Sequence, residues 1–345
     1  MVKRSGISRP PNMGDVAKAV GVSKTTISRY LHGQYHYMSE QTRQRIAKVI
    51  REMGYRPNKV AQSLKATNSF MIGVTLADIS NPFSSQVLKG VQGECDTRGI
   101  QLLVSDSSDN PDKERANIES LLDAQVDGLI VNTVGGNDDY LRDLCDAYDH
   151  RPLVLLDRLV DKARCDSVEN NNLDSALALM AHLADEQFEF VAYVTYPVAG
   201  ISPREFRMRA LRHYVDEGRF DGQVIEYSDL EGLREQLFQV LEKHRSQRIC
   251  LFINNEYSMR DVLSVLPSEL RGHIGMCTFA DRRWAQYVEN GVTCFDQNAV
   301  DLGRKAAQML LGRVYDGYDG PYRLVRIPTT MHVFASTTDI VPRFA

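Results

Sequence analysis

Short apolar runs alternate with amphipathic stretches along most of this chain, and the alternation begins near residue 70. The runs are rich in Val, Ile, Leu and Phe and have the length of buried strands. The expected strands cover residues 70–76, 100–105, 127–132, 152–156, 190–195, 223–227, 248–253, 274–279 and 292–295. The expected helices cover residues 83–98, 112–124, 138–149, 172–187, 203–217, 230–244, 256–266, 282–290 and 298–312. This alternation predicts parallel, doubly wound α/β structure.

The strand–helix unit repeats about four times before residue 157 and four or five times after residue 188. Two similar subdomains with a cleft between them are therefore favoured over one large sheet. Ligands of such sheets bind at the carboxyl ends of the strands. The candidate ligand loops follow residues 76, 132, 156, 195, 253 and 279.

Residues 12–54 have a different pattern, which predicts three helices. Asn12, Ser23 and Ser39 are expected to cap them, because a short polar side chain can accept from the first free amides. Gly21 follows the first helix and Gly54 the third, where a left-handed residue is favoured. The apolar positions at helical spacing are Val16, Ala17, Val20, Ile27, Leu31, Ile46, Val49, Ile50 and Met53. The spacing Ala17–Gly21–Ile27 fits a helix-turn-helix, with an ordinary helical hairpin as the alternative.

Charge is divided unevenly along the chain, although the whole has a net charge of −4. Residues 1–65 hold 13 Lys and Arg against three acids, which gives +10, and the remaining 280 residues sum to −14. A basic segment on an acidic body indicates a polyanion-binding module, with a solvated basic tail as the alternative. The polar face of the second helix carries Lys24, Thr25, Ser28 and Arg29, and in a helix-turn-helix this helix enters the major groove.

Several classes of protein are not expected. The N-terminus has no apolar segment typical of a signal peptide, and no apolar run reaches membrane-spanning length. The six Cys are scattered without a metal-binding spacing, so free thiols in a cytoplasmic chain are the expectation, with no metal and no cofactor. The chain has no glycine-rich nucleotide motif, no nucleophile elbow and no H-E-x-x-H, which argues against an enzyme.

The sequence resembles the lactose-repressor (LacI/GalR) family of bacterial transcription regulators over nearly its whole length. The matching stretches are Asp15-Val16-Ala17, Ala19-Val20-Gly21-Val22-Ser23, Thr26-Ile27-Ser28-Arg29, Tyr55-Arg56-Pro57-Asn58, Val60-Ala61-Gln62-Ser63-Leu64, Ile72-Gly73-Val74 and Asp78-Ile79-Ser80-Asn81-Pro82-Phe83. The resemblance implies an N-terminal all-α helix-turn-helix domain and a core like periplasmic sugar-binding proteins. It also implies a homodimer on a pseudo-palindromic operator, controlled by a small effector.

The implied domains are a DNA-binding domain over residues 1–57, a hinge helix and linker over 58–68, and an effector-binding core over 69–345. The N-subdomain of the core is expected over about 69–168 and 298–327. The C-subdomain is expected over about 169–297 and 328–345.

The resemblance also assigns DNA contacts. The expected base-reading residues are Lys24, Thr25 and Arg29, and the expected phosphate contacts are Ser23, Thr26, Ser28 and Asn58. Residues Lys59, Ala61 and Leu64 match the hinge helix that enters the minor groove. Leu64 matches the leucine that wedges open a central base step, and the alternative for it is a packed core leucine.

In the cleft, the residues that match effector-binding positions are Phe83, Asp157, Arg158, Arg207, Asn254, Asp281, Trp284 and Gln297. The chain departs from the family at Ala280, where an acid that accepts sugar hydroxyls is usual. Either Asp281 replaces that acid or the effector lacks the hydroxyl, and Trp284 either lines the pocket or belongs to the core. Further arginines near the cleft in sequence are Arg204, Arg209, Arg282 and Arg283.

Loss of an acid among arginines favours an anionic ligand, since guanidinium binds carboxylate and phosphate bidentately. The resemblance implies a repressor of a carbohydrate-utilisation operon, and the arginines favour a sugar acid as its effector, with a sugar phosphate or neutral sugar as alternatives. The competing functions are a sugar-binding protein that does not bind DNA and a cytosolic enzyme. The basic N-terminal segment argues against the first of these, and an activity screen would test the second.

Overall fold

The computed structural model describes residues 11–31, 33–55, 68–147 and 151–340. The chain divides into two compact units, Met1–Ser69 and Phe70–Ala345. The expected DNA contacts at Asn58, Lys59, Ala61 and Leu64 lie outside the described residues.

The first unit contains the three expected helices, α1 (Met13–Val20), α2 (Lys24–Leu31) and α3 (Glu40–Met53), with a short 3₁₀ helix η1 (Tyr35–Tyr37) before α3. The predicted caps are confirmed, since Asn12 accepts from the amides of Gly14 and Asp15, Ser23 Oγ from that of Thr26, and Ser39 Oγ from that of Thr42. Gly21 and Gly54 end α1 and α3 with φ of 75° and 60°. Both values are left-handed, where a side chain is disfavoured.

The buried side chains of this unit are the ones that the helical spacing selects. Val16, Ala17 and Val20 of α1 pack against Ile27 of α2 and Ile46 of α3. Since α2 turns only Ile27 fully inward, its remaining face is open to solvent.

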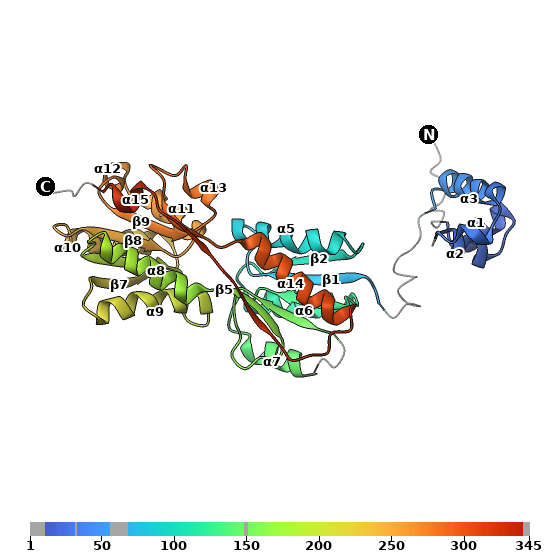
Figure 1. Ribbon diagram of the computed structural model, residues 1–345, viewed down its shortest axis with the longest axis horizontal. Helices are drawn as coiled ribbons and strands as arrows, with labels where there is room; N and C mark the ends of the chain where they lie inside the picture. The colour runs from blue at the N-terminus through green and yellow to red at the C-terminus, as the bar shows by residue number, and fades with distance from the viewer. Residues whose placement is uncertain (1–10, 32, 56–67, 148–150, 341–345) are drawn as a thin grey trace, which may run out of the picture. The chain divides into compact units, whose positions relative to one another are not determined.

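The second unit contains two six-stranded sheets, one in each subdomain (Figure 1). The N-subdomain sheet has the order β11-β5-β4-β3-β1-β2 and is parallel throughout. Its strands are β1 (Met71–Leu76), β2 (Gln101–Asp106), β3 (Gly128–Val131), β4 (Leu153–Leu156), β5 (Asp166–Asn170) and β11 (Leu324–Ile327). The C-subdomain sheet has the order β12-β10-β9-β8-β6-β7, with only the β10–β12 pair antiparallel. Its strands are β6 (Phe190–Thr195), β7 (Asp221–Glu226), β8 (Ile249–Ile253), β9 (Gly275–Phe279), β10 (Thr293–Asp296) and β12 (Thr330–His332).

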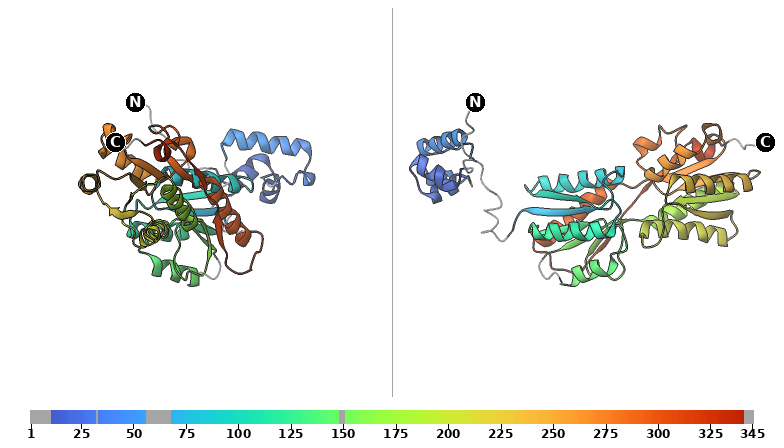
Figure 2. Two further views of the ribbon diagram at one scale, coloured as in Figure 1. Left: turned by 60° about the vertical axis from the view of Figure 1, so that its left-hand side comes forward. Right: turned by 180° about the vertical axis from the view of Figure 1, so that it is seen from behind.

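Helices cover the faces of both sheets (Figure 2). Those of the N-subdomain are α5 (Pro82–Asp96), α6 (Pro111–Asp123), α7 (Asp138–Ala147) and α14 (Ala299–Val314). Those of the C-subdomain are α8 (Asn172–Asp185), α9 (Ser202–Asp216), α10 (Leu230–Lys243), α11 (Glu256–Val265), α12 (Ser268–Arg271), α13 (Arg282–Ala285) and α15 (Ala335–Thr338). No helix in the described part of the chain is long and apolar enough to cross a membrane.

The chain passes between the subdomains three times: from β5 to α8, from β10 to α14, and from β11 to β12. The last passage is the dark red segment that runs between the two sheets in Figure 1. Each sheet therefore contains strands that are far apart in sequence.

Six elements of the second unit differ from the sequence-based expectation. Strands β5, β11 and β12 and helices α12 and α15 were not expected, and the helix expected over 282–290 ends at Ala285. Strand β5 has the sequence DSVEN, and its two acids do not fit the apolar pattern expected of a buried strand. It was therefore not predicted, although both acids are buried. The carboxylate of Asp166 bonds Arg313 and Arg323, and that of Glu169 bonds Arg326. These arginines lie about 150 residues later in the sequence, beyond the reach of local periodicity.

Helices α5 and α14 approach each other closely enough that glycine is required on both. A Cβ at Gly90 of α5 would lie 2.0 Å from the carbonyl oxygen of Val300, and one at Gly303 of α14 would lie 2.1 Å from that of Val87. The close packing holds the two helices against each other. Residues in the first turn of both helices, Phe83 in α5 and Ala299 in α14, line the wall of the cleft between the subdomains.

Candidate DNA-binding and effector-binding sites

The exposed face of α2 carries the residues expected to read DNA. Lys24, Thr25 and Arg29 are exposed. The buried face of the helix carries Ile27, which points into the core of this unit. Of the expected phosphate contacts, Ser23 is exposed, and Thr26 and Ser28 are half-buried. The hydroxyl of Ser23 lies 2.9 Å from that of Thr26, so the helix cap holds both at the start of α2. A row of donors at a helix N-terminus suits a phosphate oxygen.

Sequence reasoning missed the aromatic residues that follow α2. The guanidinium carbon of Arg29 lies 4.5 Å from the ring centre of Tyr37, and that of Arg43 lies 4.1 Å from the ring centre of Tyr35. Both tyrosines are exposed, which is unusual for rings of that size. The signal in the sequence is the run Tyr35-His36-Tyr37 inside the basic segment.

A cavity of about 490 Å³ lies between the two subdomains at the carboxyl ends of the strands. It is lined from both sides. The charged lining residues are Asp78, Asp109, Asp157, Arg158, Arg204, Arg207, Glu256, Asp281 and Asp296. The aromatic lining residues are Phe83, Tyr196, Tyr257 and Phe279. This mixture of rings and polar groups suits a small polar molecule with an apolar face.

Arg207 of α9 is held in one orientation by three hydrogen bonds. Its Nη1 donates to the carbonyl oxygen and to Oδ1 of Asn254, at 2.6 and 2.9 Å, and its Nη2 donates to Oδ1 of Asn172 at 3.0 Å. The guanidinium carbon lies 3.7 Å from the ring centre of Phe279. Only 3% of the residue is exposed, and burial lowers its pKa. Its Nε has no hydrogen-bond partner among the residues that the structure describes.

Two further arginines face the cavity from opposite subdomains. Arg158 follows β4, and its Nη1 donates to the carbonyl of Thr133 at 2.8 Å and lies 3.8 Å from the carboxylate of Asp109. Arg204 of α9 donates to the carbonyl of Pro197 at 2.8 Å. Burial, and then repulsion from Arg158, lowers the pKa of Arg204 to about 10. The low pKa reflects a cation with too few neighbouring anions.

Asp157 precedes Arg158 and adopts a left-handed backbone, with φ of 66°. Burial raises its pKa, and the positive charges of Arg158, Arg207 and Arg204 only partly offset this rise. Its Oδ1 is buried without a hydrogen-bond partner in the described part of the chain. A buried carboxylate oxygen of this kind is a natural acceptor for a ligand hydroxyl.

Of the remaining expected effector residues, all but Trp284 line the same cavity, and the polar atoms of Asp281 and Asn254 already have partners in the protein. Asp281 binds Arg283 through both oxygens and accepts from Gln86 at 2.9 Å, which holds its pKa low against the effect of burial. Asn254 lines the cavity while its Oδ1 also accepts from Tyr193. Phe83, Ala280 and Gln297 line the wall as well. Asp281 therefore faces the cavity as a carboxylate that is already paired with Arg283.

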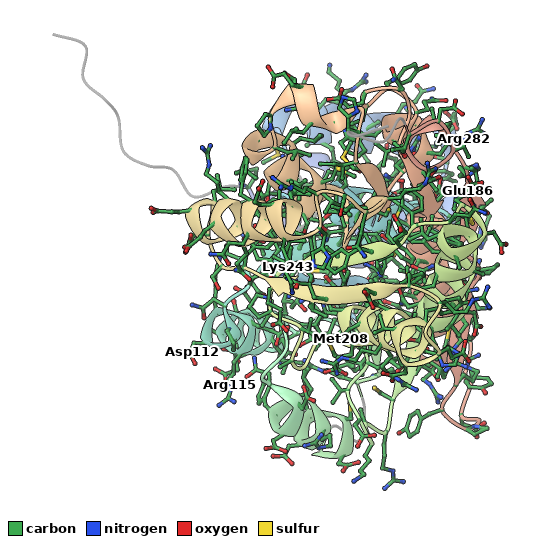
Figure 3. All side chains as sticks on the ribbon, turned by 90° about the vertical axis from the view of Figure 1, so that its left-hand side faces the viewer. Asp112, Arg115, Glu186, Met208, Lys243 and Arg282 are labelled. Carbon is green, nitrogen blue, oxygen red and sulfur yellow. The ribbon has the colours of Figure 1, made fainter. Side chains whose placement is uncertain are left out.

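Trp284 does not line the cavity. It packs against the C-subdomain core with Ala285 and Phe334, because α13 turns its ring away from the cleft. Of the arginines near the cleft in sequence, Arg209 and Arg282 are exposed, and Figure 3 shows Arg282 at the surface. Arg283 pairs with Asp281 and is mostly exposed. No cluster of metal-ligating side chains occurs in the part of the chain that the structure describes.

Two family models match the chain. Residues 12–58 match the bacterial regulatory proteins of the lacI family, and residues 72–315 match a periplasmic binding protein domain. The first match covers the helix-turn-helix, and the second covers the cavity and both sheets except their last strands, β11 and β12.

Individual proteins agree with the family models. The chain is 32% identical to the HTH-type transcriptional regulator KdgR of Bacillus subtilis over 307 residues, which is 87% of this chain and 90% of that protein. It is 32% identical to the HTH-type transcriptional regulator PtxS of Pseudomonas aeruginosa over 332 residues, covering 94% and 95% of the two chains. The fold is that of the Lac repressor dimer bound to operator and the anti-inducer ONPF, with a TM-score of 0.80, 22% identity and coverage of 95% and 99%.

The exposed basic helix, the two parallel-sheet subdomains and the cavity between them thus occur together in one chain that matches full-length regulators. The sequence-based assignment of fold and family is confirmed, and the alternative of an enzyme is not supported. The protein is a member of the lacI family of bacterial regulatory proteins, and it is a DNA-binding transcription regulator.

Proposed function

We propose that this regulator is a repressor of a carbohydrate-utilisation operon, and that its effector is a sugar acid bound in the cavity between the subdomains. The observation that carries the effector class is the set of three arginines, Arg158, Arg204 and Arg207, in the cavity wall. Among the described residues, the only carboxylate within 4 Å of any of their nitrogens is that of Asp109, at 3.8 Å from Arg158.

Of the six acids that line the cavity, only Asp109 lies within 4 Å of one of these arginines among the described residues, and three others have hydrogen-bond partners of their own. Asp281 is bound to Arg283, Asp78 accepts from Ser80, and Asp296 accepts from the amide of Asn298. A ligand carboxylate between Arg158 and Arg204 would give a close negative charge to Arg204, which has no carboxylate within 4 Å among the described residues, and a second one to Arg158. Bidentate guanidinium–carboxylate pairs are favoured in such a partly desolvated site.

The rest of the cavity is suited to a polyol. The free carboxylate oxygen of Asp157 can accept from a hydroxyl, and the rings of Phe83 and Tyr196 offer apolar faces to the carbon skeleton. A sugar acid combines a carboxylate with hydroxyls, and so it matches both parts of the site. A neutral sugar matches only the hydroxyl part, and a sugar phosphate brings a larger and more highly charged anion to the same arginines.

Calorimetry on the full-length protein tests this effector class. Hexuronates, aldonates and keto-deoxy aldonates are compared with their neutral aldoses and with the corresponding sugar phosphates. A charged hydrogen bond contributes about 1.5–3 kcal/mol, so Arg204→Ala should weaken binding of the acid roughly tenfold to a hundredfold. Arg209→Ala is the matched control, since it removes an exposed arginine from the same helix.

Tight binding of a neutral sugar, with none of its acid, would exclude the anionic effector. Preference for a phosphate ester over the acid would favour the alternative ligand. Repression is tested separately, by measuring transcription from the promoter nearest to a selected operator with and without the protein. Operator binding should survive Arg207→Ala, because residue 207 belongs to the core unit and the basic helix to the other unit.

A further inference from the structure

Asparagine side chains join the three passages of the chain between the subdomains. Asn170 ends β5 and is fully buried. Its Nδ2 donates to the carbonyl oxygen of Gln297, at 2.8 Å, and to that of Ile327, at 3.2 Å. Gln297 lies in the second passage and Ile327 at the start of the third. One side chain of the first passage therefore holds the other two.

Further hydrogen bonds complete this arrangement. The amide of Thr329, in the third passage, donates to Oδ1 of Asn171 at 2.9 Å. The Nδ2 of Asn298, in the second passage, donates to the carbonyl oxygen of Pro328 at 2.6 Å. Every pair of passages is thus bonded directly, and a rotation of one subdomain against the other must change all three together. We refer to residues 170–172, 297–298 and 327–329 as the crossover cluster.

Asn172 connects the crossover cluster to the cavity. Its Oδ1 accepts from Nη2 of Arg207 at 3.0 Å, and its Nδ2 donates to the carbonyl oxygen of Asn170 at 3.3 Å. Asn172 is 1% exposed and does not line the cavity. Its side chain has both hydrogen bonds within the protein, one to the cavity arginine and one to the residue that holds the three passages.

The geometry of Arg207 makes this connection responsive to a ligand. The Nε and Nη2 atoms share one edge of a guanidinium, the edge that binds a carboxylate side-on. In Arg207 the Nε of that edge lacks a partner, and the Nη2 is the nitrogen bonded to Asn172. An acceptor that binds this edge meets the nitrogen that Asn172 holds. Nη2 has two N–H groups, so it can donate to Asn172 and to such an acceptor at once, and the new bond then pulls on the same nitrogen that Asn172 holds. A shift of the rigid, planar guanidinium toward the acceptor therefore changes the Nη2–Asn172 distance.

We propose that Asn172 is a positioning residue for Arg207, and that the pair Asn172–Asn170 carries a displacement of Arg207 to the crossover cluster. A ligand on Arg207 thereby alters the bonds that set the angle between the subdomains. The ligand step rests on the effector site proposed above. The link from Arg207 to the crossover cluster does not, because it consists only of hydrogen bonds between residues of this chain.

The link is tested without a ligand by hydrogen–deuterium exchange of the full-length protein. Arg207→Ala should raise exchange of the Thr329 and Asn171 amides about fivefold, as expected for loss of one typical hydrogen bond in the cluster. Arg207→Lys, which keeps the charge but cannot hold Asn254 and Asn172 together, should have the same effect if the alanine variant does not fold. Arg209→Ala, an exposed change in the same helix, should leave both amides unchanged.

A double-mutant cycle separates transmission from local support. Asn172→Ala should raise exchange of the same amides, and adding Arg207→Lys to it should produce no further rise. Asn172→Asp keeps the acceptor for Arg207 but loses the donor to Asn170. In this variant the backbone amides next to Arg207 should exchange as slowly as in the unmodified protein, whereas the amides of the crossover cluster should exchange faster. Asn117→Ala removes a comparable side chain-to-backbone bond in α6 and should leave the cluster unchanged.

The proposal is overturned if the two substitutions are additive, or if Arg207→Lys leaves the crossover cluster as protected as in the unmodified protein. None of these samples contains an effector. Failure of the sugar-acid screen would therefore reject the effector class and would not alter the outcome of this experiment.

Discussion

Replacement of two glycines in α5 should change stability in opposite directions, although they lie three residues apart. A Cβ at Gly90 would lie 2.0 Å from the carbonyl oxygen of Val300 and 2.8 Å from the amide nitrogen of Arg304. A Cβ at Gly93 would meet no atom within 4 Å. The two substitutions therefore share the same chemistry and the same helix, and they differ in what faces the new methyl group.

The magnitudes follow from the geometry. Ordinary contact begins at 3.4 Å, so Gly90→Ala must displace the α14 backbone by about 1.4 Å. Overpacking of this kind costs about 1–3 kcal/mol, and the neighbour here is backbone, which cannot change its rotamer. Gly93→Ala meets no such obstacle and should gain roughly 1 kcal/mol from helix propensity. The two variants should therefore differ by about 2–4 kcal/mol in unfolding free energy.

Urea denaturation followed by circular dichroism at 222 nm measures this difference, and thermal midpoints should be separated by roughly 5–15 °C. Because α5 and α14 both begin at the cavity wall, Gly90→Ala should also weaken ligand binding, whereas Gly93→Ala should not. Equal stability of the two variants, or a more stable Gly90→Ala, would show that the close contact of α5 with α14 does not exist in solution.

Three further outcomes are expected. Asp166→Asn should lower the free energy of unfolding by about 3–5 kcal/mol, because the carboxylate is fully buried between Arg313 and Arg323. Asp316→Asn, which removes one partner of an exposed ion pair, should lower it by less than about 1 kcal/mol in the same urea assay. Burial alone would raise the pKa of Asp166, but the two arginines hold it below 3.8, so its contribution is present above that pH and is lost on acidification. The stability gap between the unmodified protein and Asp166→Asn should accordingly narrow from pH 7 to pH 3, and a constant gap would contradict the assignment. Arg29→Ala should reduce the binding free energy by about 1–3 kcal/mol at one base pair of an operator selected from random DNA, and the preference for that base should relax. Equal weakening of binding to all sequences would show that Arg29 does not read a base.

The sequence predicted correctly those elements whose buried face is formed by apolar residues at regular spacing within the element itself. Ile27 and Ile46 appear at helical spacing, the β8 run is apolar throughout, and the β6 run is apolar up to Thr195, so the local sequence pattern locates these elements. Asn12 and Ser39 bond amides within three residues, which is why the caps could also be predicted. The family resemblance then supplied the order of the domains.

The candidate site could be predicted only in part. Arg158, Arg207 and Asp157 were expected in the cleft and do line the cavity. The role of Asp281 could not be predicted, because Gln86, which bonds it, lies 195 residues away. The position of Trp284 likewise depended on where α13 ends.

By itself, then, the sequence determined the helix-turn-helix and the doubly wound core, and it placed Asp157, Arg158 and Arg207 in the cleft. The tertiary structure alone decided which polar groups are already paired and which remain for a ligand. It also decided that β5, with its acids Asp166 and Glu169, is a buried strand, and that Asn172 joins Arg207 to the crossover cluster. The physical reason is the same in each case. The spacing of apolar residues within a segment shows which of its faces is buried. The partner of a buried charge or amide in these cases comes from a distant part of the chain, so no local pattern reveals it.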